Sequence, residues 1–133
     1  MPQPYIFALV LVFGSASLWD GFTTVYGTSQ IMGGGMIGII AGVLVALIVL
    51  IMLSGTNVFW FQEWGSNREI QLWIFRIFWL GALCYDAYTS YLGNERFLVS
   101  EYPSGPENFV LVGMTFLVTG SPVMMSILFS LDN

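Results

Sequence analysis

The sequence predicts an all-α integral membrane protein with four spanning helices, and three observations carry this prediction. Of its 133 residues, 56% are hydrophobic and only 8% are charged, whereas a soluble domain carries about 25% charged residues. Four apolar stretches are each long enough to cross a bilayer, which takes about 20 helical residues. Apolar residues do not alternate with a period of two, which disfavours a membrane barrel. We therefore expect a single membrane domain over residues 1–133.

The four predicted spans cover residues 4–26, 31–53, 70–92 and 108–131. Residues 27–30 predict a tight turn between the first two spans. The segment 54–67 contains Trp60 and Trp64, and tryptophan favours the headgroup layer, so this segment is expected to lie on the membrane as a short helix or loop. The segment 94–107 contains three glutamates and two prolines, which predicts an irregular acidic loop.

The arginines predict the orientation of the chain. The N-terminus, Arg68 and Arg76 fall on one side of the predicted membrane and Arg96 on the other. The positive-inside rule then places both termini in the cytoplasm. Arg76 lies about 9 Å inside its helix, from which its side chain can reach the surface. We expect Trp73 and Trp79, three residues to either side, to hold its guanidinium group.

The composition also excludes several classes of function. The net charge is −5, with no lysine and no histidine, so the basic surface that nucleic acid requires is missing. Without histidine the chain has no imidazole for haem ligation or for Ser-His catalysis. Cys84 is the only cysteine and cannot form a multi-thiolate metal site. We therefore expect neither an enzyme nor a cofactor or metal site.

A repeated pattern is the most informative feature of the sequence. The segments 19–27 and 85–93 align at an offset of 66 residues. Each has an acid, two hydroxyls and a glycine at positions i, i+3, i+4 and i+7, which share one helical face. These residues are Asp20, Thr23, Thr24 and Gly27 in the first segment, and Asp86, Thr89, Ser90 and Gly93 in the second. The pattern predicts two parallel repeated helical hairpins, related by an axis along the membrane normal.

Three interpretations of the two aspartates remain open. They form a structural cluster with the hydroxyls, they form an ion or proton site, or water alone solvates them. We expect Gly27 and Gly93 to end their helices, which places both carboxyl groups near the non-cytoplasmic interface. Asp20 would lie about 24 Å along its helix from Pro4, in a core about 30 Å thick. That shallow depth disfavours a transport site at the midplane.

Two further motifs concern helix packing. Gly34, Gly38 and Gly42 form a small-xxx-small stripe, which permits close approach of another helix. That helix belongs either to this chain or to a second copy or a partner. Pro122, which follows Thr119 and Ser121 near the middle of the fourth span, predicts a kink. We expect the hydroxyls of Thr119 and Ser121 to satisfy the backbone groups that the proline frees.

The sequence thus predicts a small, non-catalytic membrane subunit with a structural or accessory role in an assembly. Its partners would be the lipid bilayer, further copies of the chain or other membrane subunits, and not nucleic acid. A first alternative is an oligomeric ion channel or small transporter that uses Asp20 and Asp86 with the neighbouring hydroxyls. A second alternative is a viral envelope or virion membrane protein.

Overall fold

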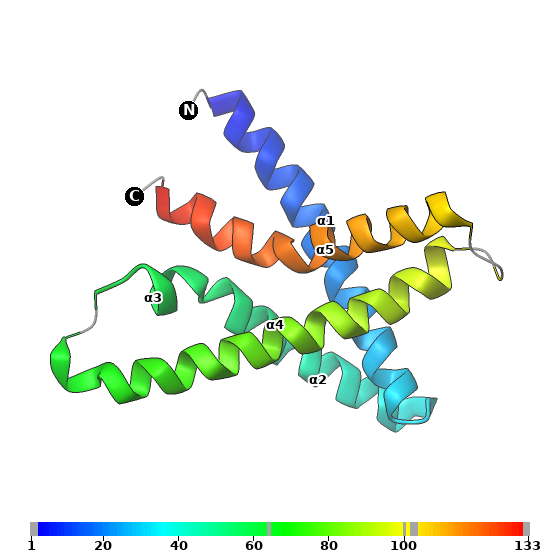
Figure 1. Cartoon of the computed structure of the whole chain (residues 1–133), viewed down its shortest axis with the longest axis horizontal. Helices are drawn as coiled ribbons and strands as arrows, with labels where there is room; N and C mark the ends of the chain where they lie inside the picture. Colours follow the sequence, from blue (N-terminus) through cyan, green and yellow to red (C-terminus); the bar gives the residue numbers. More distant parts are fainter. Residues whose placement is uncertain (1–2, 64, 100, 102–103, 132–133) are drawn as a thin grey trace.

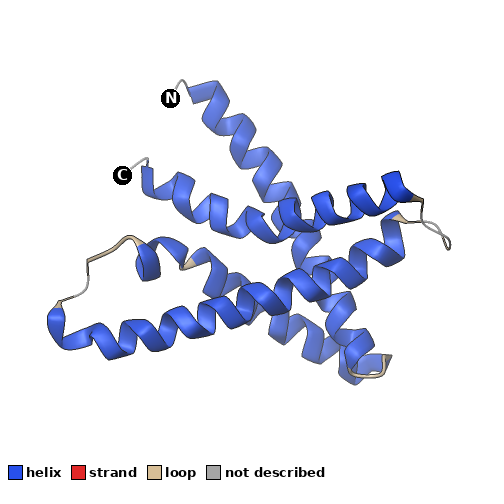
Figure 2. Ribbon diagram, in the orientation of Figure 1, coloured by secondary structure: helices blue, strands red, loops and turns tan. Residues whose placement is uncertain are grey.

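The computed structural model describes residues 3–63, 65–99, 101 and 104–131, and every regular element among them is helical (Figures 1 and 2). The long helices are α1 (Gln3–Ile31), α2 (Gly35–Ser54), α4 (Glu69–Leu98) and α5 (Gly105–Leu131). Two short elements, α3 (Thr56–Trp60) and the 3-10 turn η1 (Ser66–Arg68), connect α2 to α4. The four long helices are long and apolar enough to cross a membrane. The predicted all-helical class is confirmed, and these four candidate spans support a multi-pass membrane protein.

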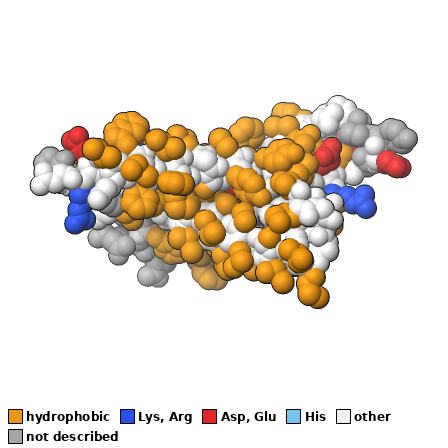
Figure 3. Space-filling model, turned by 90° about the horizontal axis from the view of Figure 1, so that it is seen from below, with side chains coloured by type: hydrophobic (Ala, Val, Ile, Leu, Met, Phe, Trp, Pro, Cys, Tyr) orange, Lys and Arg blue, Asp and Glu red, His pale blue; other side chains and the backbone are white. Residues whose placement is uncertain are grey.

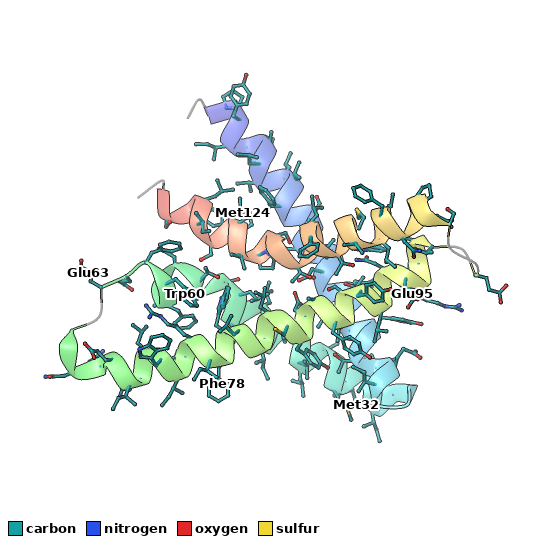
Figure 4. All side chains as sticks on the ribbon, viewed as in Figure 1. Met32, Trp60, Glu63, Phe78, Glu95 and Met124 are labelled. Atoms are coloured by element: carbon teal, nitrogen blue, oxygen red, sulfur yellow. The ribbon has the colours of Figure 1, made fainter. Side chains whose placement is uncertain are left out.

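The long helices alternate in direction. In Figure 1, α1 and α4 run one way along the long axis and α2 and α5 return. The beginning of α1, the end of α5 and the α3–η1 segment therefore lie at one end, here called the terminal end. The α1–α2 turn lies at the opposite end, here called the turn end. Figure 4 shows Glu63 and Trp60 at the terminal end, and Met32 and Glu95 at the turn end.

The distribution of side chains is that of a membrane protein. Figure 3 shows hydrophobic side chains along the length of the visible face and charged side chains gathered at its two ends. Apolar residues of α2 such as Met36, Ile37 and Ile51 are at least 70% exposed. Much of the buried set is polar instead, and the apolar core cluster is small: Val49, Leu53 and Trp79. This fits a bilayer, where contact with lipid tails costs an apolar side chain nothing and small or polar residues hold helices together.

The helices are longer than the sequence predicts, and the loops are shorter. Helix α1 continues to Ile31 and α4 to Leu98, so the expected turn at 27–30 is helical and residues 94–98 of the expected acidic loop belong to α4. The chain reverses after α1 through Gly33, Gly34 and Gly35, whose φ angles are +82°, +77° and +76°. Glycine adopts this left-handed region without steric cost. The turn between the first two long helices is therefore formed by these three glycines and not by residues 27–30.

Arg76 of α4 contacts the segment 54–67, and its aromatic partners differ in part from those that the sequence predicts. The Nε atom of Arg76 donates a hydrogen bond to the carbonyl oxygen of Phe59, 2.9 Å away. Its guanidinium carbon lies 4.9 Å from the ring centroid of Trp60 and 5.3 Å from that of Trp73. Trp60, rather than Trp79, is thus the second aromatic partner. The expected interfacial residue Trp64 lies outside the described residues.

Pro122 does not interrupt α5, which is helical from Gly105 to Leu131 and bends near its middle in Figure 1. Proline has no backbone N–H, so the carbonyl of Val118 loses its helical donor. The hydroxyl of Ser121 replaces it, donating to that carbonyl over 2.7 Å. Thr119 does not share this role, because its hydroxyl is buried without a hydrogen-bond partner in the described chain.

The glycine stripe of α2 packs against α1. A Cβ atom added to Gly42 would lie 2.6 Å from the carbonyl oxygen of Val25, and one added to Gly38 would lie 3.1 Å from that of Ser29. Gly34 is not part of this contact, because it precedes α2 and has nothing within 4 Å of an added Cβ. Of the two interpretations, packing within the chain therefore holds for Gly38 and Gly42.

Candidate functional site: a polar cluster between α1 and α4

Helices α1 and α4 cross at very short range (Figure 1), and two glycines make this possible. A Cβ atom added to Gly27 would lie 2.7 Å from the carbonyl oxygen of Thr89. One added to Gly93 would lie 2.6 Å from the Cβ of Thr23. Each glycine thus faces the threonine of the other helix. The expectation that Gly27 and Gly93 end their helices is wrong, since both lie inside helices and serve the crossing.

The crossing brings together the six polar residues that the sequence singled out. They are Asp20, Thr23, Thr24, Asp86, Thr89 and Ser90, and we call them the polar cluster. None of them is more than 4% exposed. Ser90 donates a hydrogen bond to Asp20 Oδ1, and Thr24 donates one to Asp86 Oδ1, each over 2.7 Å. Thr23 donates to Ser90 Oγ over 3.1 Å. The interpretation in which water alone solvates the aspartates is therefore excluded.

The contacts across the crossing are reciprocal. Moving each residue of the Asp20–Ser90 pair by the 66-residue offset gives the Asp86–Thr24 pair. The same exchange relates two further hydrogen bonds that flank the cluster. In these, Trp19 Nε1 donates to Asn94 Oδ1 and the hydroxyls of Thr28 and Tyr85 pair, each over 2.8 Å. Such exchange is the contact pattern of two similar helices that cross about a local twofold axis.

The flanking bonds include residues that the sequence analysis missed. Trp19 and Tyr85 are the first residues of the two aligned segments, and they received no polar role. Thr28 and Asn94 come directly after the aligned segments and correspond to one another at the same offset. Extending the alignment by one residue would have included them. It stopped at Gly27 and Gly93 because we expected the helices to end there.

The cluster lies deeper than the sequence suggested. Asp20 precedes the end of α1 by eleven residues, and Asp86 precedes the end of α4 by twelve. At 1.5 Å per residue these separations are about 16 and 18 Å along the helices. The carboxyl groups therefore do not lie at the helix ends, and a shallow position no longer disfavours a transport site.

No basic side chain within the described residues balances the two carboxyl groups. Helix α1 has no charged residue besides Asp20, α2 has none, and α5 has only Glu107 in its first turn. Arg76 and Arg96 of α4 are each ten residues from Asp86, about 15 Å along the helix. The Oδ2 atom of Asp86 is buried and has no hydrogen-bond partner in the described chain.

A cavity lies towards each end of the molecule, and neither cavity is lined by a residue of the polar cluster. The cavity at the terminal end measures about 480 Å³. Its polar lining residues are Ser17, Ser54, Asn57, Ser126 and Ser130. The cavity at the turn end measures about 710 Å³, and its lining includes Tyr26, Gln30, Glu95, Arg96 and Glu101. Ser17, which lines the first cavity, pairs its hydroxyl with that of Ser121 over 2.9 Å.

Carboxyl and hydroxyl oxygens in this arrangement can tie two helices together, and they can also hold a proton or a hard cation. Among the described residues no group of three or more acidic, histidine or cysteine side chains forms a metal site. Comparison of the chain with protein families, curated proteins and solved structures finds no match. The functional argument therefore rests on the geometry of the cluster.

Proposed function

We propose that this protein is a small, non-catalytic, multi-pass membrane subunit that acts by helix packing within a membrane assembly. The observation that carries the proposal is the combination of a fixed interior with an apolar exterior. The polar cluster and two glycine contacts hold α1 against α4, while large apolar side chains remain exposed on all four long helices. Such a molecule offers preformed surfaces to lipid and to neighbouring subunits.

The first half of α1 is the surface that we assign to a partner. Figure 1 shows it diverging from α2 and α4, and its residues Tyr5, Phe7, Leu11 and Val12 are 54–66% exposed. A second transmembrane helix can cover these side chains. Aromatic residues are frequent anchors of protein interfaces, and Tyr5 and Phe7 provide two of them.

Purification of the intact protein in mild detergent, followed by mass spectrometry of what accompanies it, tests the accessory role. Unrelated subunits in fixed stoichiometry support it, and the paired change Phe7→Ala with Leu11→Ala should reduce their recovery. The matched change Phe109→Ala with Val112→Ala removes exposed side chains of α5 and should leave recovery unchanged. A purely homo-oligomeric or monomeric preparation would contradict the accessory role.

We further propose that the chain consists of two parallel hairpins, α1–α2 and α4–α5, both built on the repeated segment. The reciprocal hydrogen bonds between α1 and α4 support this. The likeness is strongest in the first helix of each hairpin, because the glycine contact of α2 has no counterpart in α5. An added Cβ at Gly113 or Gly120 meets nothing within 4 Å.

We propose that both termini are cytoplasmic, and labelling of introduced cysteines tests this orientation. In a Cys84→Ser background, Ser104→Cys places an exposed thiol at the turn end, and Asn67→Cys places one at the terminal end. A membrane-impermeant thiol reagent added from outside intact cells should label the cysteine at 104 and leave the one at 67 unlabelled. The opposite result would reverse the orientation.

A second candidate function is ion or proton transport through an oligomer, with the polar cluster as its binding site. The observation that favours it is a pair of buried carboxyl groups that no basic side chain of the described residues balances. Intramembrane carboxyl groups are costly to bury and are often functional.

Flux measurements in liposomes test this second candidate. Asp20→Asn and Asp86→Asn keep the side-chain shape and an oxygen that accepts a hydrogen bond, so folding should persist while flux is abolished. Glu95→Gln is the matched control, because it makes the same chemical change at an exposed position of α4. Equal flux in all three variants would remove the cluster from any transport role.

A further inference from the structure

We propose that Asp20 and Asp86 share one proton, and that this proton exchanges with the terminal end alone, by way of Ser17 and the cavity that it lines. This inference deepens the second candidate function by naming the ligand and its entry side. It does not require that the protein conducts ions, so its test is independent of flux.

Charge balance requires a positive partner for the pair. Asp20 and Asp86 are buried in one hydrogen-bonded cluster. Two carboxylates in such a medium of low dielectric cannot both remain ionised, because their mutual repulsion and the loss of hydration add. The groups that face them offer no countercharge: α2 is uncharged, α5 has only Glu107 in its first turn, and the neighbouring phenol of Tyr85 is paired with Thr28. One proton reduces the charge of the pair by one and gives the second carboxylate a donor.

The hydrogen-bond directions favour a proton over a metal cation. Ser90 and Thr24 donate their hydrogens to the two carboxyl groups, and Thr23 donates to Ser90. Their hydrogens thus occupy the space between the oxygens, whereas a calcium or magnesium ion needs about six oxygens that direct lone pairs towards it. The Oδ2 atom of Asp86 is buried and has no hydrogen-bond partner in the described chain, so it is a free acceptor position. One proton suits it.

The route follows one face of α1. Ser17 lines the cavity of about 480 Å³ at the terminal end and precedes Asp20 by three residues, so the two share a helical face. Ser121 uses its hydrogen on the carbonyl of Val118, so Ser17 is the donor in the Ser17–Ser121 pair. The lone pairs of Ser17 remain available to hold a water of the cavity, whose volume exceeds the roughly 30 Å³ that one water occupies in the liquid. That water accepts the proton from the carboxyl group and passes it to further water in the cavity, so Ser17 positions the water and is not itself protonated.

The crossing closes the route towards the turn end. On the turn-end side of the two carboxyl groups, Gly27 lies against Thr89 and Gly93 lies against Thr23, with no room for even one added carbon. The Trp19–Asn94 and Thr28–Tyr85 bonds flank these contacts. The cavity at the turn end is therefore separated from the carboxyl pair by packed backbone.

Infrared spectroscopy of the full-length protein in lipid nanodiscs tests both parts of the inference. The protein with ¹³C-labelled aspartate side chains should show the carbonyl stretch of a neutral carboxyl group at pH 7, and the double variant Asp20→Asn with Asp86→Asn should lose it. On transfer to deuterium oxide the band should shift as the proton exchanges. Ser17→Ala should slow this exchange by about a hundredfold, the scale of a positioned proton-transfer group.

Two control variants keep the route falsifiable. Ser17→Thr retains the hydroxyl and should restore the exchange rate, while Ser15→Ala removes an exposed hydroxyl of α1 and should leave it unchanged. Equal exchange rates in Ser17→Ala and the unmodified protein would overturn the route. Two ionised carboxylates at pH 7, or a neutral band that disappears when sodium replaces choline in the buffer, would overturn the shared proton. A neutral carboxyl band in a protein that shows no flux would contradict the second candidate function and would support the shared proton.

Discussion

Gly27→Ala is expected to separate α1 from α4 and destabilise the folded protein by about 1–3 kcal/mol, the usual cost of overpacking. The new methyl group would meet three atoms of Thr89 at 2.7–2.8 Å, of which two are backbone atoms. Backbone atoms cannot swing aside as a flexible side chain does, so the helices themselves must move. The free energy of unfolding, measured by denaturant titration in detergent micelles, reports the effect, and Gly93→Ala should behave similarly.

Other glycines of the same helices provide the matched controls. An added Cβ at Gly21 of α1 or Gly81 of α4 meets nothing within 4 Å. Alanine has the higher helix propensity, by about 0.5–1 kcal/mol, so Gly21→Ala and Gly81→Ala should leave stability unchanged or raise it. If Gly27→Ala were as stable as Gly21→Ala, the close crossing of α1 and α4 would be refuted.

Asp86→Ala is expected to cost about 1–3 kcal/mol, because it leaves the buried hydroxyl of Thr24 without its acceptor. Asp86 is 0% exposed, and its Oδ1 accepts the 2.7 Å bond from Thr24. Asp86→Asn keeps an oxygen at that place and should cost less. Thermal unfolding of the purified variants, followed by circular dichroism, ranks the three proteins.

Glu95→Ala is the control for Asp86→Ala, since it removes an exposed carboxyl group from the same helix. Surface changes of this kind stay within about 0.5 kcal/mol. Equal stability of Asp86→Ala and Glu95→Ala would show that the polar cluster does not hold the helices together. Together with the glycine variants, this comparison separates the contribution of hydrogen bonding from that of close packing.

The pairing partners within the cluster could be predicted only in outline. The 66-residue offset indicated which faces of the first and third spans are polar, and these faces do meet. The offset could not show that Asp20 bonds Ser90 and Asp86 bonds Thr24, because the crossing point of two helices depends on where their backbones approach. That approach is set by Gly27 and Gly93, to which the sequence analysis had given a different role.

The prediction that Gly27 and Gly93 end their helices was wrong for a physical reason. In water, a glycine that follows an apolar helix commonly ends it, because solvent accepts the free backbone groups. In a bilayer no solvent is available for those groups, so the helix continues through the glycine and keeps its hydrogen bonds. Helices α1 and α4 accordingly run four and five residues past Gly27 and Gly93, and the carboxyl groups lie deeper than predicted.

By itself the sequence determined the apolar composition, the four helices long enough to span a membrane and the polar face of α1 and α4, because hydropathy and helical period are local properties of the sequence. Only the tertiary structure decided that the two faces bury each other, that Gly38 and Gly42 pack against α1, and that Trp60 joins Trp73 around Arg76. Those outcomes depend on which backbones come within contact distance. The hydrophobic effect does not select these contacts, because lipid tails cover apolar side chains as well as another helix does.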